Sequence, residues 1–135
     1  MSNFKLLEFP AHTDARGTLT PIEFDDSLPF TPQRVYYAYN TKAARGGHCH
    51  LQEKEIFICL GGSCRALIDS DGQGKQEILL DSPTKALYVS THVWHEFDDF
   101  SDGATLLCLS STHYLPGEQN YETDYEEFKK LIVTK

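Results

Sequence analysis

The sequence predicts an all-β fold, a small barrel or jelly roll with one short C-terminal helix. Short apolar or alternating runs recur along the chain, and turn residues separate them evenly, which is typical of barrels and jelly rolls. Only the tail differs. There Tyr125, Phe128, Leu131 and Ile132 fall at helical spacing behind acidic residues that suit a first helical turn.

The expected strands follow from these runs in chain order. Each combines apolar, β-branched or aromatic residues, and they are 4–9, 18–24, 34–40, 55–60, 63–69, 77–80, 86–90, 92–97 and 104–110. Residues 14–17, 61–62, 71–74, 81–83 and 101–103 are rich in Gly, Asp, Ser and Pro, which predicts turns or hairpins between them. The C-terminal segment then closes the chain as a helix.

Length and composition predict one soluble domain over residues 1–135. The chain is 40% apolar and carries a formal charge of −8 without a Lys/Arg cluster, which argues against nucleic acid or an anionic membrane as partner. No apolar run reaches the roughly 18 residues of a membrane span, and the start lacks a signal-peptide core, so we expect a cytoplasmic protein. The four cysteines lack CxxC spacing and are expected to be mostly buried thiols.

The stretch Arg45-Gly46-Gly47-His48-Cys49-His50 is the strongest site candidate. Histidines two apart in an extended strand project from the same face, so both imidazoles would meet one pocket. Such a pair suits either metal ligation or proton transfer near neutral pH. The residues alone leave both open.

Glu55 and Gly62 extend this stretch into the first half of the metal-binding pattern of cupins, HxHx4E followed by x6G. The second half is usually PxG, two residues and a histidine. Here residues 90–95 keep His95 but lack the Pro and the Gly. One alternative is therefore a metal-dependent cupin enzyme with His48, His50, Glu55 and His95 as ligands.

Other residues suit a sugar-phosphate pocket. Alternation along residues 34–40 puts Arg34 and Tyr36 on one face. Arg16 and Arg45 each stand near glycines in loops, where a guanidinium can bind a phosphate or carboxylate in bidentate fashion. Trp94, with Phe97, is a candidate stacking wall for a base or sugar ring.

Several segments together resemble a known family. DARG at 14–17, RVYYAYN at 34–40, RGGHCH at 45–50, VWHEFDDFSDGATLLCLSS at 93–111 and NYETDYEEF at 120–128 resemble the WxcM-like cupins, sugar 3,4-ketoisomerases that act on dTDP-4-keto-6-deoxyglucose. Their reaction serves the biosynthesis of dTDP-linked 3-amino-3,6-dideoxy sugars. The resemblance implies a cupin-type jelly-roll barrel, no cofactor or metal, a dTDP-sugar substrate and a homodimer with exchanged N-terminal strands.

The resemblance also implies roles for individual residues. His48 and His50 would be the catalytic pair and Tyr36 the nearby phenol, while Arg16, Arg45 and His95 would line the nucleotide-sugar pocket. Arg16 and His95 are similar to the members that give galacto products. Two positions depart from the family pattern. Cys49 replaces the usual Ala, and Glu55 stands where Gln is common.

The expected reaction moves a carbonyl from C4 to C3 through an enediol. It needs one group that takes the C3 proton and returns a proton to C4, and others that exchange protons between O4 and O3. We assign the carbon proton to His50 and the oxygen exchange to His48 with Tyr36, with the reverse order open. Besides the metal-dependent enzyme, a dTDP-sugar 3,5-epimerase and a non-catalytic sugar-binding cupin remain alternatives.

Overall fold

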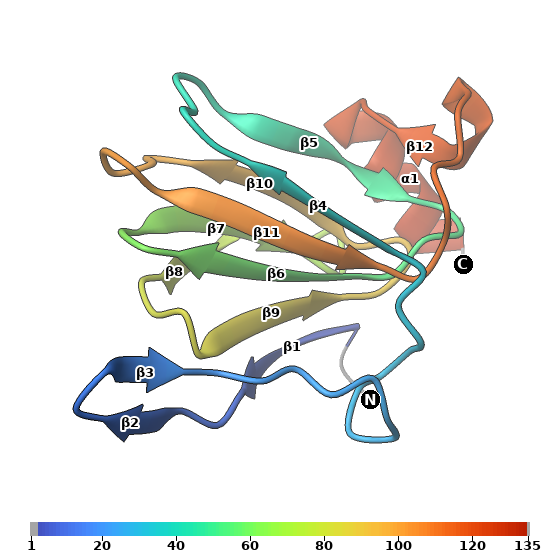
Figure 1. Cartoon of the computed structure of the whole chain (residues 1–135). Coiled ribbons are helices and arrows are strands. Elements are labelled where there is room, and N and C mark those ends of the chain that lie inside the picture. The colour runs from blue at the N-terminus through green and yellow to red at the C-terminus, as the bar shows by residue number, and fades with distance from the viewer. Residues whose placement is uncertain (1–2, 135) are drawn as a thin grey trace.

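The computed structural model describes residues 3–134, and its frame is two five-stranded antiparallel sheets packed face to face (Figure 1). The strand order is β1-β9-β6-β11-β4 in the first sheet and β12-β5-β10-β7-β8 in the second. A separate hairpin is formed by β2 and β3. The jelly-roll architecture predicted from the sequence is confirmed.

The elements have the following bounds. They are β1 (Phe4–Glu8), β2 (His12–Asp14), β3 (Gly17–Leu19), β4 (Arg34–Ala38), β5 (Arg45–His50), β6 (Glu55–Leu60), β7 (Cys64–Asp69), β8 (Gln76–Leu80), β9 (Lys85–Val89), β10 (Trp94–Asp98), β11 (Thr105–Ser110), the 3₁₀ turn η1 (Glu118–Asn120), β12 (Tyr121–Glu122) and α1 (Tyr125–Thr134).

Several expected strands are shorter than the sequence predicts, and in two of them the backbone shows the reason. The run 18–24 leaves the strand conformation after Leu19, just before Pro21, which has no N–H to donate to a ladder. Residues 20–33 instead cross the outer face of the first sheet, where Leu28 belongs to a cluster with Ile56 and Ile58. The run 92–97 becomes a strand only at Trp94, because His92 has a left-handed φ of 61°.

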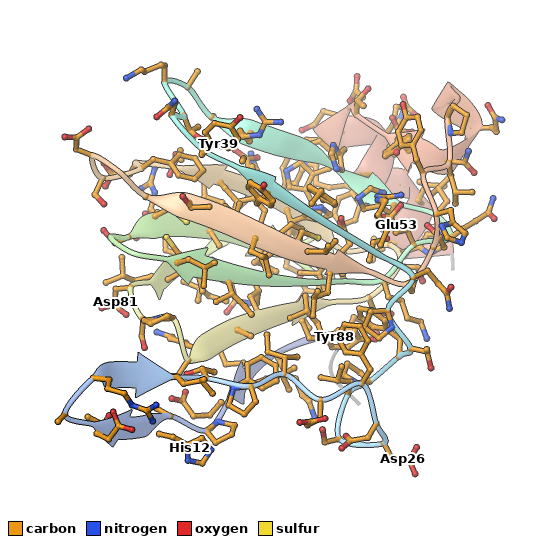
Figure 2. All side chains as sticks on the ribbon, in the orientation of Figure 1. His12, Asp26, Tyr39, Glu53, Asp81 and Tyr88 are labelled. Carbon is orange, nitrogen blue, oxygen red and sulfur yellow. The ribbon has the colours of Figure 1, made fainter. Side chains whose placement is uncertain are left out.

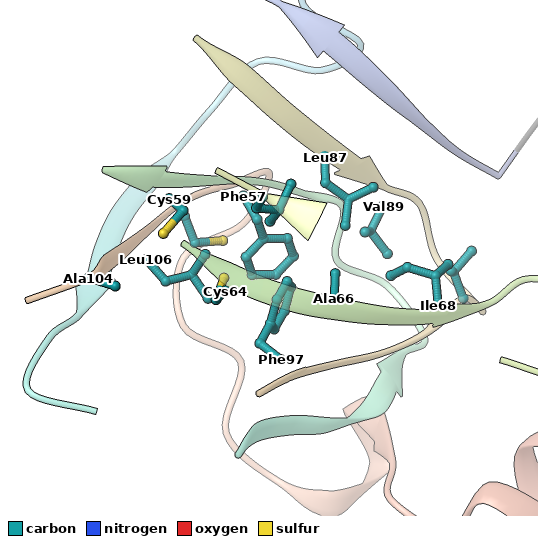
Figure 3. Packing of buried hydrophobic residues seen from close by; sticks show 13 residues of the cluster. Phe57, Cys59, Cys64, Ala66, Ile68, Leu87, Val89, Phe97, Ala104 and Leu106 are labelled. Atoms are coloured by element: carbon teal, nitrogen blue, oxygen red, sulfur yellow. The ribbon is translucent and has the colours of Figure 1, made fainter. Parts of the chain in front are cut away.

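The main core lies between the two sheets (Figure 3). Inward-facing side chains of alternating strand positions fill it, as expected when each sheet buries one face. Its buried members are Phe57, Cys59, Cys64, Ala66, Ile68, Leu80, Leu87, Val89, Val93, Phe97, Ala104, Leu106 and Cys108. The prediction that the cysteines are buried thiols is confirmed, since Cys49, Cys59, Cys64 and Cys108 are all free and buried.

The C-terminal helix is also confirmed. Asp124 caps α1, because its Oδ1 accepts hydrogen bonds from the backbone N–H of Glu126 and Glu127. Phe128 packs in a small cluster with Cys49 and Trp94 behind the second sheet. In the described part of the chain α1 is the one α-helix, and it is too short and too polar to span a lipid bilayer.

The sheets leave one side of the sandwich open. β4 ends the first sheet, β5 lies near the end of the second, and no ladder joins the two within residues 3–134 (Figure 1). The hairpin β2–β3 extends away from both sheets, and all its residues are exposed. Figure 2 shows His12 of this hairpin far across the molecule from Glu53, which lies at the open side.

Candidate active site

Backbone geometry brings β5 unusually close to β10. Gly46 has a φ of +81°, and a Cβ on it would lie 3.0 Å from the carbonyl oxygen of His95, so a side chain is excluded there. The register places His48 opposite His95, and a bulge follows between His95 and Glu96. Cys49 faces the other way and is fully buried, as the alternation predicts.

Three imidazoles consequently gather between the sheets. The ring centroids of His48 and His50 are 4.7 Å apart, those of His48 and His95 5.0 Å, and those of His50 and His95 5.3 Å. His50 and His95 are 6% and 1% exposed. The predicted pair therefore exists, and a third histidine joins it from β10.

Glu55, at the start of β6, is the centre of the contacts. Its Oε1 lies 2.7 Å from Nε2 of His50 and 3.4 Å from Nε2 of His95. Its Oε2 accepts hydrogen bonds from the Tyr36 hydroxyl at 2.5 Å and from the Cys108 thiol at 3.2 Å. Both carboxylate oxygens thus face protein groups, and the side chain is 1% exposed.

These contacts determine which groups are charged. Burial alone would raise the pKa of Glu55, but His50 and His95 outweigh it and hold that pKa well below its ordinary range. Burial, aided by the charge of Glu55, raises the pKa of Tyr36. Burial also raises the pKa of the Cys108 thiol. Glu55 is therefore an ionised carboxylate among neutral hydroxyl and thiol donors.

His48 has a different environment from His50. Burial, together with repulsion by His95 and His50, lowers the pKa of His48 to about 3 against the opposing attraction of Glu55. The His48 imidazole is therefore neutral at physiological pH. Among residues 3–134 no hydrogen bond engages its ring nitrogens, whereas His95 donates from Nδ1 to the carbonyl oxygen of Val93 at 3.0 Å.

A second buried carboxylate stands beside His50. Glu53 is 2% exposed, and its Oε1 lies 4.0 Å from Nδ1 of His50. Its Oε2 accepts a hydrogen bond from Arg34 at 3.1 Å, and its Oε1 accepts one from Thr112 at 3.2 Å. Burial and the nearby charge of Glu55 raise the pKa of Glu53. His50 thus has Glu55 beside its Nε2 and Glu53 near its Nδ1.

Two cavities meet at Tyr36 and His48. The inner one, of about 110 Å³, is lined by Arg45, His95 and Cys108 together with apolar side chains. The outer one, of about 370 Å³, is lined by Arg34, His50, Glu53, Tyr114 and Tyr121. Tyr36 and His48 line both. A ligand in the cleft between β4 and β5 would therefore contact these two residues.

Most residues predicted for the site are brought together. Arg34, Tyr36, Arg45, His48, His50 and His95 all line one or both cavities. Trp94 does not, because it lies on the opposite face of β10 and packs against Tyr125 and Phe128 at the helix. The stacking-wall interpretation of Trp94 is corrected accordingly, since alternation along β10 sends His95 inward and Trp94 outward.

Arg16 also lies away from the cavities of its own chain. It sits in the turn of the exposed hairpin, where its Nη2 forms an ion pair with Asp14 at 2.5 Å. Its side chain is 91% exposed. Within one chain, then, Arg16 does not reach the imidazole cluster. The sequence could not place it, since a loop arginine carries no information on where its hairpin points.

The sequence analysis did not assign four polar cavity residues to the site, namely Glu53, Cys108, Tyr114 and Tyr121. Glu53 precedes β6, so strand alternation did not include it. Cys108 was predicted only as a buried thiol, and Tyr121 comes from the two-residue strand β12, which is too short to leave a periodic signal. The spacing from His50 to Glu55 was the one available signal for a carboxylate nearby.

The geometry also bears on a metal. In the described residues two sets have ligand atoms within 4.8 Å of one another, His48 with His50 and His95, and His50 with Glu53 and Glu55. Imidazoles and carboxylates are suitable ligands for a divalent transition metal. However, Glu55 Oε2 already accepts hydrogen bonds from Tyr36 and Cys108, which leaves only Oε1, beside His50 and His95, for an ion. In this arrangement the Glu55 carboxylate positions Tyr36, Cys108 and His50.

The family model and a curated relative point to one group of enzymes. The family model described as "FdtA: WxcM-like, C-terminal" matches residues 2–133. A TDP-4-oxo-6-deoxy-alpha-D-glucose-3,4-oxoisomerase from Aneurinibacillus thermoaerophilus is 43% identical over 131 residues, which cover 96% of this chain and 92% of that protein.

Solved structures are similar over the same length. A 3,4-ketoisomerase from Helicobacter canadensis is 36% identical, with a TM-score of 0.89 over 98% of this chain and 99% of that one. QdtA, a sugar 3,4-ketoisomerase from Thermoanaerobacterium thermosaccharolyticum in complex with TDP, is 33% identical, with a TM-score of 0.90 over 98% and 96%.

Proposed function

The chain belongs to the FdtA, WxcM-like family, and from this membership we propose that it is a sugar-nucleotide 3,4-ketoisomerase. The proposed substrate is dTDP-4-keto-6-deoxyglucose, whose carbonyl moves from C4 to C3. The enzyme is an isomerase, and its product would serve the biosynthesis of dTDP-linked 3-amino-3,6-dideoxy sugars. A nucleotide-sugar substrate agrees with the cytoplasmic location expected from the sequence.

The observation that carries the proposal is the position of His48, which lines both cavities where they meet. Isomerisation removes the proton from C3, forms an enediol and returns a proton to C4, so no electrons leave the substrate. One imidazole can do both carbon steps, because it becomes an imidazolium in the first and donates a proton to C4 in the second, after its N–H has exchanged with solvent. A lone pair on the base is required at the start, and the neutral imidazole of His48 has one.

His48 suits the carbon proton better than His50 does. The sequence left the order of the two open with His50 preferred, and the geometry supports the reverse. His50 is 6% exposed, has Glu55 at 2.7 Å from its Nε2 and lines only the outer cavity. His48 lines both cavities. We therefore assign the oxygen exchange to His50 with Tyr36, both of which Glu55 holds in place.

Tyr36 is proposed to handle the oxygen protons. Its side chain lines both cavities and is held by Glu55, which also contacts His50, so one carboxylate positions both groups. Protonation of O4 when the enediol forms, and removal of the O3 proton when it collapses, then use these two groups in opposite directions. This agrees with the net exchange that the reaction requires.

Arg45 lines the inner cavity and Arg34 the outer one. Either guanidinium can supply positive charge for the diphosphate of the substrate. Charge-assisted contacts of this kind anchor the non-reacting part of the substrate, and their binding energy holds the hexose in register with His48. His95 lines the sugar side of the inner cavity. Arg16 requires a second copy of the chain.

We also propose a homodimer in which the N-terminal strands are exchanged. The exposed β2–β3 hairpin, which extends away from its own sheets, supports this arrangement (Figure 1). An exchange would bury the hairpin and bring Arg16 of each subunit toward the cleft of the other. It reconciles the pocket role implied by the family resemblance with the position of Arg16 in one chain.

Incubation with dTDP-4-keto-6-deoxyglucose tests the function. We expect NMR to show the carbonyl carbon signal moving from C4 to C3, and the C4 proton coupling to report galacto or gluco configuration. The 3,5-epimerase alternative instead predicts inversion at C3 and C5 with the carbonyl kept at C4. Tight binding without any conversion would support the non-catalytic alternative.

A further inference from the structure

Tyr121 covers the catalytic histidines from the C-terminal side. It is the first residue of β12 and pairs with His50 of β5. Its ring centroid lies 4.9 Å from that of His50 and 5.4 Å from that of His48. The strand just before the helix therefore brings a second phenol to the same imidazoles that Tyr36 approaches from β4.

The two phenols differ in what their hydroxyls do. The Tyr36 hydroxyl donates to Glu55 at 2.5 Å and is engaged before any substrate binds. The Tyr121 hydroxyl makes no hydrogen bond to any residue from 3 to 134, although the side chain lines the outer cavity with Arg34 and Tyr114. Its donor is thus available to a ligand in that cavity.

The surroundings keep this hydroxyl protonated. Burial raises the pKa of Tyr121, and the charges of Glu53 and Glu55 raise it further against a smaller opposing effect of Arg34. A protonated phenol beside the base His48 is a hydrogen-bond donor close to the carbons at which that base acts. Negative charge develops on the oxygens of those carbons as the enediol forms, and a fixed donor there stabilises it.

We propose that the Tyr121 hydroxyl donates a hydrogen bond to an oxygen on one of the two reacting carbons of the hexose. This rests on the proposed ketoisomerase function and adds a substrate-orienting residue to it. The hexose, rather than the nucleotide, is the partner, because Tyr121 lies against His48 and any group within reach of both is at the reacting end. This contact is a hydrogen bond, and neither a proton nor an electron is transferred in it.

Tyr121→Phe tests the proposal, since it keeps the ring that packs on the imidazoles and removes only the hydroxyl. We expect kcat to fall about a hundredfold, at the lower end of the range seen when one donor to a developing oxyanion is lost. The melting temperature should stay unchanged. Tyr37→Phe is the matched control, because Tyr37 is 60% exposed on the other face of β4, and its kcat should stay within about twofold.

A binding measurement separates this role from a structural one. In a His48→Asn background, which should bind substrate without turning it over, adding Tyr121→Phe is expected to weaken dTDP-4-keto-6-deoxyglucose binding about threefold to tenfold and leave dTDP binding unchanged. Equal loss for both ligands, or wild-type kcat and affinity in the Phe variant, would overturn the inference. An inactive wild-type enzyme would instead refute the proposed function itself.

Discussion

Replacing Glu55 by its isosteric amide, Glu55→Gln, is expected to preserve most isomerase activity. The carboxylate is 1% exposed and faces Tyr36 and Cys108 with one oxygen and His50 and His95 with the other. The amide oxygen can accept from Tyr36 and Cys108. Its NH₂ group can then donate to lone pairs on Nε2 of His50 and of His95, so every neighbour keeps a hydrogen-bond partner.

The size of the effect follows from these contacts. Hydrogen bonds to charged groups contribute about 1.5–3 kcal/mol and neutral ones about 0.5–1.5 kcal/mol, so the exchange costs roughly 1–1.5 kcal/mol for each bond. Removing a buried charge, whose desolvation costs several kcal/mol, offsets most of the sum. We therefore expect a loss of stability below about 1.5 kcal/mol and a loss of kcat below about tenfold. Glu55→Leu leaves its partners without an acceptor and should cost about 3–5 kcal/mol.

Guanidinium denaturation and NMR turnover assays on untagged protein measure the two quantities, with metal content determined on the same samples. If Glu55 is instead a metal ligand, the Gln variant loses both the ion and its activity, because a neutral amide is a much poorer ligand than a carboxylate. A folded Glu55→Gln enzyme with kcat lowered more than a hundredfold would refute the positioning role given to this carboxylate.

Three further results are expected. His48→Asn should abolish turnover while dTDP affinity stays near the wild-type value, and appreciable remaining turnover would rule out His48 as the carbon base. Arg45→Ala should weaken dTDP binding by roughly 1.5–3 kcal/mol in calorimetry, with Arg16→Ala weakening it only in the dimer; unchanged affinity in both removes them from the phosphate site. Because the pKa of His48 falls from 6.5 to about 3 on folding, the unfolded chain takes up a proton that the folded chain does not, so stability should decrease as pH drops from about 6.5 toward 3. His48→Asn should flatten that decrease, and equal pH dependence in both proteins would argue against a buried neutral imidazole.

Local periodicity was sufficient to predict the sheets and much of the site. Alternation placed His48 and His50 on one face and turned Cys49 away, and the structure agrees at all three positions. Alternation did not decide between Trp94 and His95. The register of β10 determines which of these two neighbours faces the cleft, and a short run that begins with His92 and Val93 does not define that register.

Long-range geometry accounts for what the sequence could not predict. Glu55 was noted for its spacing from His50, but its contacts with Tyr36 and Cys108 depend on β4, β6 and β11 lying side by side. Tyr121 joins the site through a two-residue strand formed only when the chain returns from β11. The position of Arg16 depends on where a hairpin points, which no local pattern specifies.

The central claim is that a histidine base moves a proton between C3 and C4 without a metal. The most direct test is to run the reaction in D₂O with chelator-treated protein containing less than about one metal ion per ten chains. We expect full conversion to the 3-keto sugar, with deuterium entering at C4 of the product and at C3 of recovered substrate. Activity that requires added metal, or conversion that leaves both carbons free of deuterium after long equilibration, would contradict it.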